Sequence, residues 1–334
     1  MKKIYLFIIS ILLLVFMIYL IGIDKLIESI RNSNPYIILL AILVHFITLT
    51  IRSLRWGYII NKVTDFKDNF IVKMIGLFAA NLTPVRTGGE IFTAVAGKEI
   101  NGISLFNGLS AGFIERLFDA VVSFILLFLC IFLVPKNFLS QTNQIFLLIG
   151  ILAISAYLII IYLFNWRENF SLYLYNILHS IIKILPISED FLNKLYTKVT
   201  FGLKEMVKSS KEFSNKKNLF TVFTISLSSW VLECLRLYLI IRAFNIDIPF
   251  FVVIFIFFIA DIAGLVSLLP GGMGSLELST AHLLTLFNVP FALAGTIILI
   301  DRLISYWIIN LIGAIFTLHY TKDIFNGIKK SLTD

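Results

Sequence analysis

Ionisable side chains interrupt the apolar runs of this sequence at many positions. A charged group in lipid costs roughly 2.5–3.5 kcal/mol on membrane-insertion scales, so their number requires a physical reason. Two reasons are open: the charges pair with one another and lock helices together, or they line a polar cavity that holds a ligand. The positions within or beside apolar runs are Arg86, Glu90, Glu115, Arg116, Asp119, Glu233, Arg236, Asp261, Glu277, Asp301 and Arg302.

Arginine and glycine supply groups that bind phosphate. The planar guanidinium donors of Arg86, Arg116 and Arg302 match the geometry of phosphate oxygens. A helix that begins just after a glycine cluster directs its free backbone N–H groups and the positive end of its dipole toward an anion. The glycines in question are Gly88, Gly89, Gly271, Gly272 and Gly274. Together these residues predict a site for an anionic or phosphate-bearing headgroup.

The acidic residues in the same regions have two interpretations. A carboxylate in a cavity of low dielectric constant can gate the cavity or carry a proton. The residues considered for this role are Glu90, Glu115, Glu277 and Asp301. Alternatively, Glu90 and Glu277 each cap the N-terminus of their own helix. A third group is predicted to form structural ion pairs that lock helices together: Asp119, Glu233 and Arg236.

Motifs for metal, nucleotide or dinucleotide chemistry do not occur in the sequence. It contains no HExxH, CxxC, P-loop or GxGxxG pattern, so no metal, cofactor or catalytic residue is predicted. His45 and His282 lie in apolar stretches without a second ligand at metal spacing, and they are interpreted as core histidines. Cys130 and Cys234 are interpreted as inert core residues.

The composition is that of a membrane protein. Of the 334 residues, 59% are apolar and 14% charged, whereas about 25% of the residues of a soluble protein are charged. Continuous apolar runs of about 20 residues match helices that cross roughly 30 Å of hydrocarbon, and they lack the alternation of a β-barrel. The net charge of +8 is attributed to basic cytoplasmic loops, and no nucleic-acid partner is predicted.

The predicted fold is an all-α polytopic membrane protein with a single membrane domain over residues 1–334. It has about six full spans and two re-entrant hairpins of half-length helices. The hairpins, at residues 70–96 and 249–287, contain helix breaks at Pro84 and Pro270. The six spans are residues 4–23, 35–56, 104–134, 145–164, 219–243 and 290–319.

An internal repeat relates the two breaks. From Pro84 to Glu115 and Arg116 is 31 and 32 residues, and from Pro270 to Asp301 and Arg302 is also 31 and 32. A glutamate follows each proline by six or seven residues, and each acid–arginine pair is followed by leucine. These features predict a duplication, with one half at about 35–134 and the other at about 219–319. Their predicted topology is inverted, which is an architecture of secondary transporters.

Basic residues predict the orientation in the membrane. The polar segment 165–218 carries nine Lys/Arg against five Asp/Glu, which places it and both termini in the cytoplasm. Within it, residues 172–185 and 191–213 are predicted as amphipathic helices along the inner leaflet. Arg52, Arg55 and Trp56 are interpreted as a basic, aromatic edge at the cytoplasmic interface, with Lys73 on the same side.

Four segments resemble the lysylphosphatidylglycerol synthase/flippase transmembrane family. They are Asn81-Leu-Thr-Pro-Val-Arg-Thr-Gly-Gly-Glu90, Glu115-Arg-Leu-Phe-Asp119, Pro270-Gly-Gly-Met-Gly-Ser-Leu-Glu277 and Asp301-Arg302. The resemblance extends over about residues 5–320. It implies translocation of a lipid. The family's full-length synthases carry a soluble aminoacyltransferase domain that has no counterpart in this sequence, so the resemblance argues against aminoacyl transfer by this chain.

The expected function is therefore lipid translocation, by a flippase or scramblase in the cell membrane, and not catalysis. Two alternatives are a lipid-presenting membrane subunit and an intramembrane transferase in the synthesis of lipids or lipid-linked glycans. An anion channel shares the half-helix argument. The expected partners are membrane lipids, with a lipid-modifying enzyme as a further candidate, and the oligomeric state is left open.

Overall fold

The computed structural model describes residues 12–13, 15–60, 63–83, 88–133, 155–156, 158–183 and 189–333. Every regular element in these ranges is helical, which confirms the all-α prediction. The α-helices are α2 (Ile23–Arg31), α3 (Pro35–Ile59), α4 (Phe66–Leu82), α5 (Gly88–Ala96), α6 (Leu105–Leu133), α8 (Glu168–Ile182), α9 (Glu189–Phe213), α10 (Lys216–Ala243), α11 (Phe250–Val266), α12 (Ser275–Thr285), α13 (Phe291–Arg302) and α14 (Ile308–Thr333). Short π-helical turns occur at Gly97–Asn101 and Leu303–Trp307, and a 3₁₀ turn at Pro270–Gly272.

Three helical stretches in the described ranges are long and apolar enough to cross a membrane. They are Pro35–Ile59, Lys216–Ala243 and Phe291–Tyr320, with 25, 28 and 30 residues. At 1.5 Å per residue each is longer than about 37 Å, which exceeds the roughly 30 Å of hydrocarbon in a bilayer. They match three of the predicted spans, and α6 matches a fourth predicted helix. The predicted spans at 4–23 and 145–164 lie only partly within the described residues, where 15–21 and 158–166 are helical.

Local sequence explains where the two central helices begin. The Asn34 side chain accepts hydrogen bonds from the backbone N–H groups of Tyr36 and Ile37, and Pro35 occupies the first turn of α3. The Asn215 side chain caps α10 in the same way, by accepting from the N–H of Asn218. Both helices therefore start at an asparagine that satisfies N–H groups without a helical partner.

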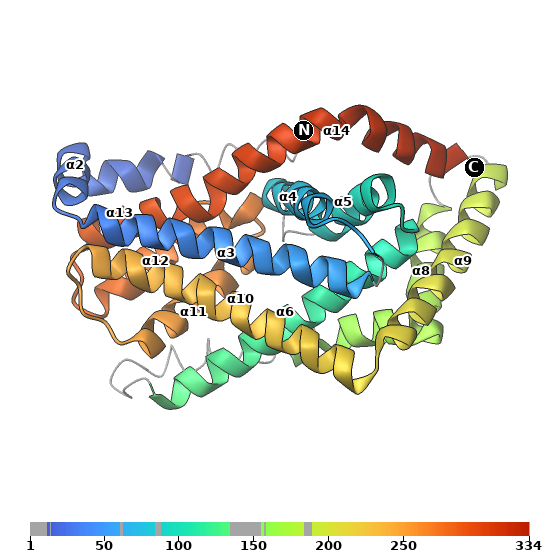
Figure 1. Cartoon of the computed structure of the whole chain (residues 1–334), viewed down its shortest axis with the longest axis horizontal. Helices are drawn as coiled ribbons and strands as arrows, with labels where there is room; N and C mark the ends of the chain where they lie inside the picture. Colours follow the sequence, from blue (N-terminus) through green and yellow to red (C-terminus); the bar gives the residue numbers. More distant parts are fainter. Residues whose placement is uncertain are drawn as a thin grey trace.

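Helices α3 and α10 pack along each other through the middle of the molecule (Figure 1). On the N-terminal side of the sequence, α4 packs against α5, and on the C-terminal side α11 packs against α12, so each predicted break lies between two contacting helices. Helix α6 also packs on α11, and α14 packs on α4. The two halves of the sequence are thus interlocked, because the long helix of each covers the hairpin of the other.

The second break is a glycine turn that touches the first hairpin. Gly271 has φ +59°, and a Cβ there would lie 2.5 Å from the Tyr306 ring and 3.0 Å from the carbonyl oxygen of Asn81. A larger residue is therefore excluded by backbone conformation and by space. Tyr306 also donates from its hydroxyl to Asn81 O at 3.3 Å, and the Asn81 side chain donates to Asn310 at 2.9 Å. Pro84, at the first break, lies outside the described residues.

The polar segment 165–218 contains two helices, as predicted, in α8 and α9. They form one end of the molecule (Figure 1). Helix α9 packs on α6, where Gly202 lies against Phe106 and the Ser110 and Ser210 hydroxyls are 2.7 Å apart. Large apolar side chains remain exposed on α8, namely Tyr173, Ile177, Leu178 and Ile181. Their contact with the inner leaflet stays a prediction.

The close approach of α4 and α5 generates a prediction about stability. A Cβ on Gly76 would lie 1.8 Å from Thr93 Oγ1, whose hydroxyl donates to Gly89 O. We expect Gly76→Ala to destabilise the fold by about 1–3 kcal/mol, which is typical of overpacking. Thermal unfolding of the detergent-solubilised protein measures this effect. In the control Gly264→Ala, the new Cβ meets nothing closer than 3.3 Å, so we expect a smaller shift; equal shifts would contradict the packing argument.

Candidate functional site

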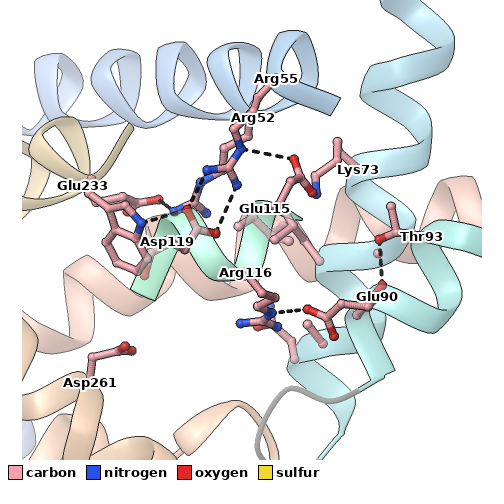
Figure 2. A pocket seen from close by; sticks show the side chains of 18 of the residues that line it. Arg52, Arg55, Lys73, Glu90, Thr93, Glu115, Arg116, Asp119, Glu233 and Asp261 are labelled. Atoms are coloured by element: carbon pink, nitrogen blue, oxygen red, sulfur yellow. Dashed lines mark hydrogen bonds and ion pairs between the residues drawn. The ribbon is translucent and has the colours of Figure 1, made fainter. Parts of the chain in front are cut away.

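A cavity of about 170 Å³ lies where the two halves meet, bordered by charged side chains (Figure 2). Six basic and six acidic residues line it, so its formal charge is balanced. The basic residues are Arg52, Arg55, Lys73, Arg116, Arg236 and Arg302; the acidic residues are Glu90, Glu115, Asp119, Glu233, Asp261 and Asp301. The net charge therefore does not favour either an anionic or a cationic ligand. Which ligand the cavity binds depends on which of these side chains are already paired.

Arg55 is the centre of the first ion-pair network. Its Nη1 and Nη2 donate to the two carboxylate oxygens of Asp119 at 2.6 and 3.1 Å, and its Nε donates to Glu115 at 3.2 Å. Nη1 also lies 2.7 Å from the Ser226 hydroxyl. The second oxygen of Glu115 accepts from Lys73 Nζ at 2.6 Å. With only 2% of its side chain exposed, Arg55 joins α3 to α6 and α10 through four hydrogen bonds.

Arg236 is the centre of the second network. Its Nε and Nη2 donate to the two oxygens of Asp301 at 2.8 and 3.3 Å, and its Nη1 pairs with Glu233. Glu233 also forms an ion pair with Nη2 of Arg52 at 3.2 Å. The network joins α3, α10 and α13, and it is buried inside the bundle as the first one is.

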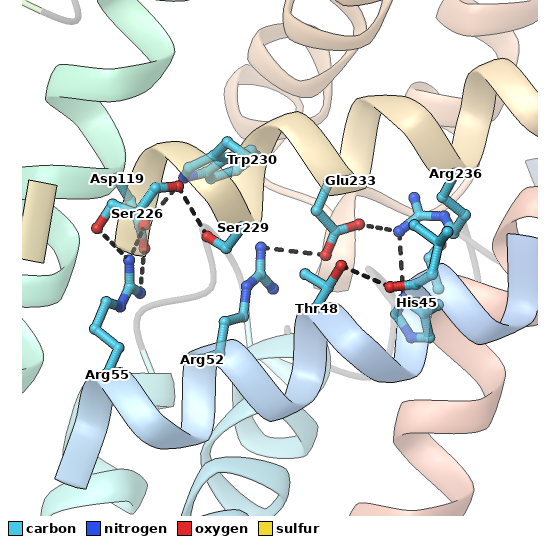
Figure 3. Close-up of polar contacts among 12 residues, drawn as sticks. His45, Thr48, Arg52, Arg55, Asp119, Ser226, Ser229, Trp230, Glu233 and Arg236 are labelled. Carbon is cyan, nitrogen blue, oxygen red and sulfur yellow. Dashed lines mark hydrogen bonds and ion pairs between the residues drawn. The ribbon is translucent and has the colours of Figure 1, made fainter. Parts of the chain in front are cut away.

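The polar residues of α3 and α10 follow the same spacing on both helices. His45, Thr48, Arg52 and Arg55 stand at positions i, i+3, i+7 and i+10 of α3, and Ser226, Ser229, Glu233 and Arg236 have the same intervals on α10. Such intervals place each set on one helix face. Figure 3 shows the two stripes facing each other across the helix pair.

The contacts between the stripes are those of a local two-fold axis. Arg55, at the end of one stripe, contacts Ser226, at the start of the other. In the reciprocal contact Arg236 lies 3.4 Å from His45 Nδ1. In both contacts the last residue of one stripe meets the first residue of the other, so α3 and α10 run antiparallel. The two helices use equivalent faces, as in an isologous interface. Arg52 and Glu233 occupy the same position, i+7, in the two stripes, so their contact spans the two-fold axis. At this position one helix carries a positive side chain and the other a negative one.

The two acid–arginine pairs make equivalent contacts. The acids Glu115 and Asp301 bind Arg55 and Arg236, the last arginines of the two stripes. The arginines that follow them bind the glutamates that begin the short helices: Arg116 pairs with Glu90, and Arg302 pairs with Glu277 at 2.7 Å. These partners are 26 and 25 residues apart in sequence. The spacing repeat in the sequence thus corresponds to a repeated set of contacts.

The two glutamate–arginine pairs differ in exposure. Glu277 and Arg302 are 1% and 8% exposed, and Glu277 also accepts from Gly274 N at 2.7 Å, so it caps its own helix. Arg302 donates to Gly271 O at 3.0 Å. Glu90 and Arg116, in contrast, are 14% and 28% exposed. The Arg302 pair is therefore more deeply buried than the Arg116 pair.

Most of the site residues predicted from the sequence gather at this cavity. Those that line it are Gly89, Glu90, Glu115, Arg116, Asp119, Glu233, Arg236, Asp301 and Arg302. The glycines at the second break and Glu277 lie behind Arg302, and Gly88 begins α5, with its N–H bonded to Thr83. Arg86 and Pro84 lie outside the described residues, so the structure does not place the Arg86 guanidinium relative to the cavity.

The interpretation of Arg52, Arg55 and Trp56 as an interfacial edge was wrong. Arg52 and Arg55 face the cavity, Trp56 is fully buried with its indole N–H bonded to Asn101, and Lys73 is buried against Glu115. A basic cluster at the end of an apolar run is typical of an interface, but here the residues are turned inward by acids on α6 and α10. The missed signal was the polar stripe that these arginines continue from His45.

Long apolar helices around a buried, charge-lined cavity define an integral helical membrane protein. The chain belongs to the family described as the transmembrane region of lysylphosphatidylglycerol synthase, whose model matches residues 4–313. The resemblance found in the sequence is thereby confirmed.

The chain is also similar along its whole length to archaeal proteins named UPF0104 membrane proteins. One from Methanothermobacter thermautotrophicus is 43% identical, with 100% of this chain and 98% of the relative covered. Another from Methanocaldococcus jannaschii is 29% identical, covering 97% and 96%. A third from Pyrococcus horikoshii is 28% identical, covering 96% and 98%. The similarity thus spans each of these relatives nearly from end to end.

The first network predicts a large difference between buried and exposed ion pairs. Arg55→Met leaves Glu115 and Asp119 without their main partner in a buried site, so we expect a loss of about 3–5 kcal/mol in stability. Lys208→Ala, which removes a pair to Glu212 on the exposed face of α9, is the control and is expected to have little effect. Thermal unfolding in detergent compares the two variants. Similar unfolding temperatures for both would show that the Arg55 network does not hold the bundle together.

Proposed function

We propose that this protein is a lipid translocase, a flippase or scramblase that moves an anionic or phosphate-bearing headgroup between the leaflets of the cell membrane. The observation that carries the proposal is the cavity lined by ionisable residues inside helices that are otherwise apolar. Each such group is costly to insert, and intramembrane charges mark pathways for polar substrates.

The size of the cavity supports a headgroup as its occupant. About 170 Å³ is far more than the roughly 10–15 Å³ needed for one water molecule, and less than the roughly 300–1,000 Å³ of pockets for drug-sized ligands. A polar headgroup fits, and the acyl chains remain outside the cavity. Translocation in this form requires polar groups only along the path of the headgroup.

The proposal includes an inverted repeat with two re-entrant hairpins, α4–α5 and α11–α12. Helices α4 and α11 have 17 residues each, about 25 Å, and α5 has nine. These lengths are shorter than the roughly 30 Å of the hydrocarbon layer, which supports half-length elements. The isologous contact of α3 and α10 supports two halves of opposite orientation. Substrate sites between inverted repeats lie near the bilayer midplane in secondary transporters.

In this proposal the two glutamate–arginine pairs act as gates. Arg116 is the more exposed of the two arginines. It leaves its ion pair with Glu90 and binds the headgroup phosphate in its place. Arg302 and Glu277 close the opposite side of the path. When this ion pair opens, the headgroup leaves the cavity on that side. Glu115 and Asp301 hold the arginines of α3 and α10 in place between the gates.

The proposed orientation puts both termini and the segment 165–218 in the cytoplasm. The nine basic residues of that segment, against five acidic ones, support this orientation. A lipid-modifying enzyme that supplies or receives the lipid is a candidate partner on the same side of the membrane.

Transbilayer movement of fluorescent lipids in proteoliposomes tests the function. We expect the wild type to move lipids with phosphate headgroups, and Arg116→Ala to lower the rate about tenfold or more, since a hydrogen bond to a charged group contributes about 1.5–3 kcal/mol. Lys204→Ala changes an exposed lysine of α9 and serves as the control.

Two outcomes would overturn the translocase proposal. One is a folded wild-type protein that moves no lipid. The other is ion conductance across a planar bilayer without lipid movement, which would identify an anion channel instead. An unchanged rate in Arg116→Ala would remove Arg116 from the headgroup path.

A further inference from the structure

Arg52 differs from the other arginines of α3 and α10 in how its donors are used. The guanidinium groups of Arg55 and Arg236 are each bound by two acids. Within the described part of the chain, Arg52 has one ion pair, from Nη2 to Glu233, although its side chain is only 15% exposed. Its Nε–H is buried and has no hydrogen-bond partner among the residues that the structure describes. Arg52 is therefore a buried cation with an unsatisfied donor at the cavity wall.

The acid that Arg52 contacts is shared. Glu233 pairs through its other oxygen with Arg236, so one carboxylate serves two guanidinium groups. A buried donor without an acceptor is destabilising, so an acceptor that bonds to it would be stabilised in the cavity. Arg52 lines the cavity together with Arg116 and Arg302.

We propose that Arg52 is the central phosphate contact of the site and makes it selective for phosphate esters over uncharged headgroups. The inference rests on the proposed function. It narrows the anionic or phosphate-bearing headgroup to a phosphate ester and names the residue that binds it. A guanidinium offers parallel N–H donors that fit two phosphate oxygens, and a phosphate diester offers acceptors without donors of its own. Sugar hydroxyls would satisfy the Nε–H without neutralising the charge. Because the cavity is balanced overall, selectivity follows the phosphate and not the net charge of the headgroup.

Trp230 provides a reporter next to Arg52. The Arg52 guanidinium lies over the indole ring, 5.6 Å from its centroid, and the indole N–H donates to Asp119 at 2.9 Å. Both residues line the cavity. A phosphate bound by Arg52 changes the electrostatic field at the ring, so binding is expected to alter the fluorescence of Trp230.

The first experiment compares two fluorescent lipids with identical acyl chains in proteoliposomes: a phosphatidyl lipid and a hexosyl diacylglycerol without phosphate. We expect the wild type to move the phosphatidyl lipid about tenfold faster or more, and Arg52→Gln to reduce this ratio to near one. Glu233 keeps Arg236 as a partner in this variant, which favours folding. The matched control is Thr48→Val on the same stripe, since Thr48 bonds to the backbone of its own helix and is outside the cavity lining.

The second experiment measures binding without transport. Glycerol 3-phosphate is titrated into the full-length protein in detergent, and glycerol serves as the uncharged control. We expect a saturable change of fluorescence with glycerol 3-phosphate that is lost in Trp230→Phe and in Arg52→Gln. Arg52→Lys keeps the charge but lacks the fork of donors, so its affinity is expected to fall about tenfold. If Arg52→Gln fails to fold, the affinity of Arg52→Lys for glycerol 3-phosphate tests the proposal, and an unchanged affinity would overturn it.

The outcomes separate this inference from the proposed function. A wild type that moves no lipid, but binds glycerol 3-phosphate through Arg52, overturns the translocase and keeps the phosphate site. A wild type that moves lipid, with an unchanged lipid ratio and an unchanged Trp230 response in the Arg52 variants, overturns the inference and keeps the translocase.

Discussion

The structure depends on the pairing of buried charges between α3 and α10. Neither helix could stay in an apolar surrounding with its arginines and glutamate unpaired, since an isolated charge there is costly. Facing each other, the two stripes share the Arg52–Glu233 pair, and Glu115, Asp119 and Asp301 from helices farther along the chain bind the remaining arginines. The packing of α6 and α13 against the central pair follows from these contacts. Charge pairing therefore specifies the arrangement, while apolar side chains fill the space around it.

The same constraint explains why the interior is polar but balanced. Each arginine of the stripes is held by carboxylates from a different helix, so the donors cannot be rearranged without moving a helix. In a membrane the hydrophobic effect does not drive helices together, and interhelical hydrogen bonds and close packing take its place. The close contact of Gly76 with Thr93 and the Arg55 network are examples of these two forces.

Much of the fold follows from the sequence because its signals are local. Apolar length defined the helices around α3, α10 and α13–α14, and the glycine turn at the second break was visible as Pro270-Gly-Gly-Met-Gly. The repeated spacing also identified Glu90, Arg116, Glu277 and Arg302, although it could not show which of them pair. That information depends on three-dimensional packing of distant segments.

Arg52 and Arg55 show where sequence reasoning fails. Arginine next to tryptophan at the end of an apolar run has the same local pattern whether it meets lipid headgroups or a buried acid. The acids that bind Arg55, Glu115 and Asp119 on α6, are 60 and 64 residues away in sequence. The regular interval from His45 through Arg55 was the one local sign that these side chains share an inward face.

The contact between the Gly271 turn and the end of α4 has a mechanical consequence. Gly271 fits between the Tyr306 ring and the carbonyl oxygen at the end of α4, with no space for even a methyl group. A shift of the Gly271 turn toward α4 must displace Asn81, and a shift of Asn81 must displace the turn. A movement of the Gly271 turn is therefore coupled to a movement of the end of α4, and such coupling is reciprocal. The helix pairs α4–α5 and α11–α12 are therefore expected to move together and not independently.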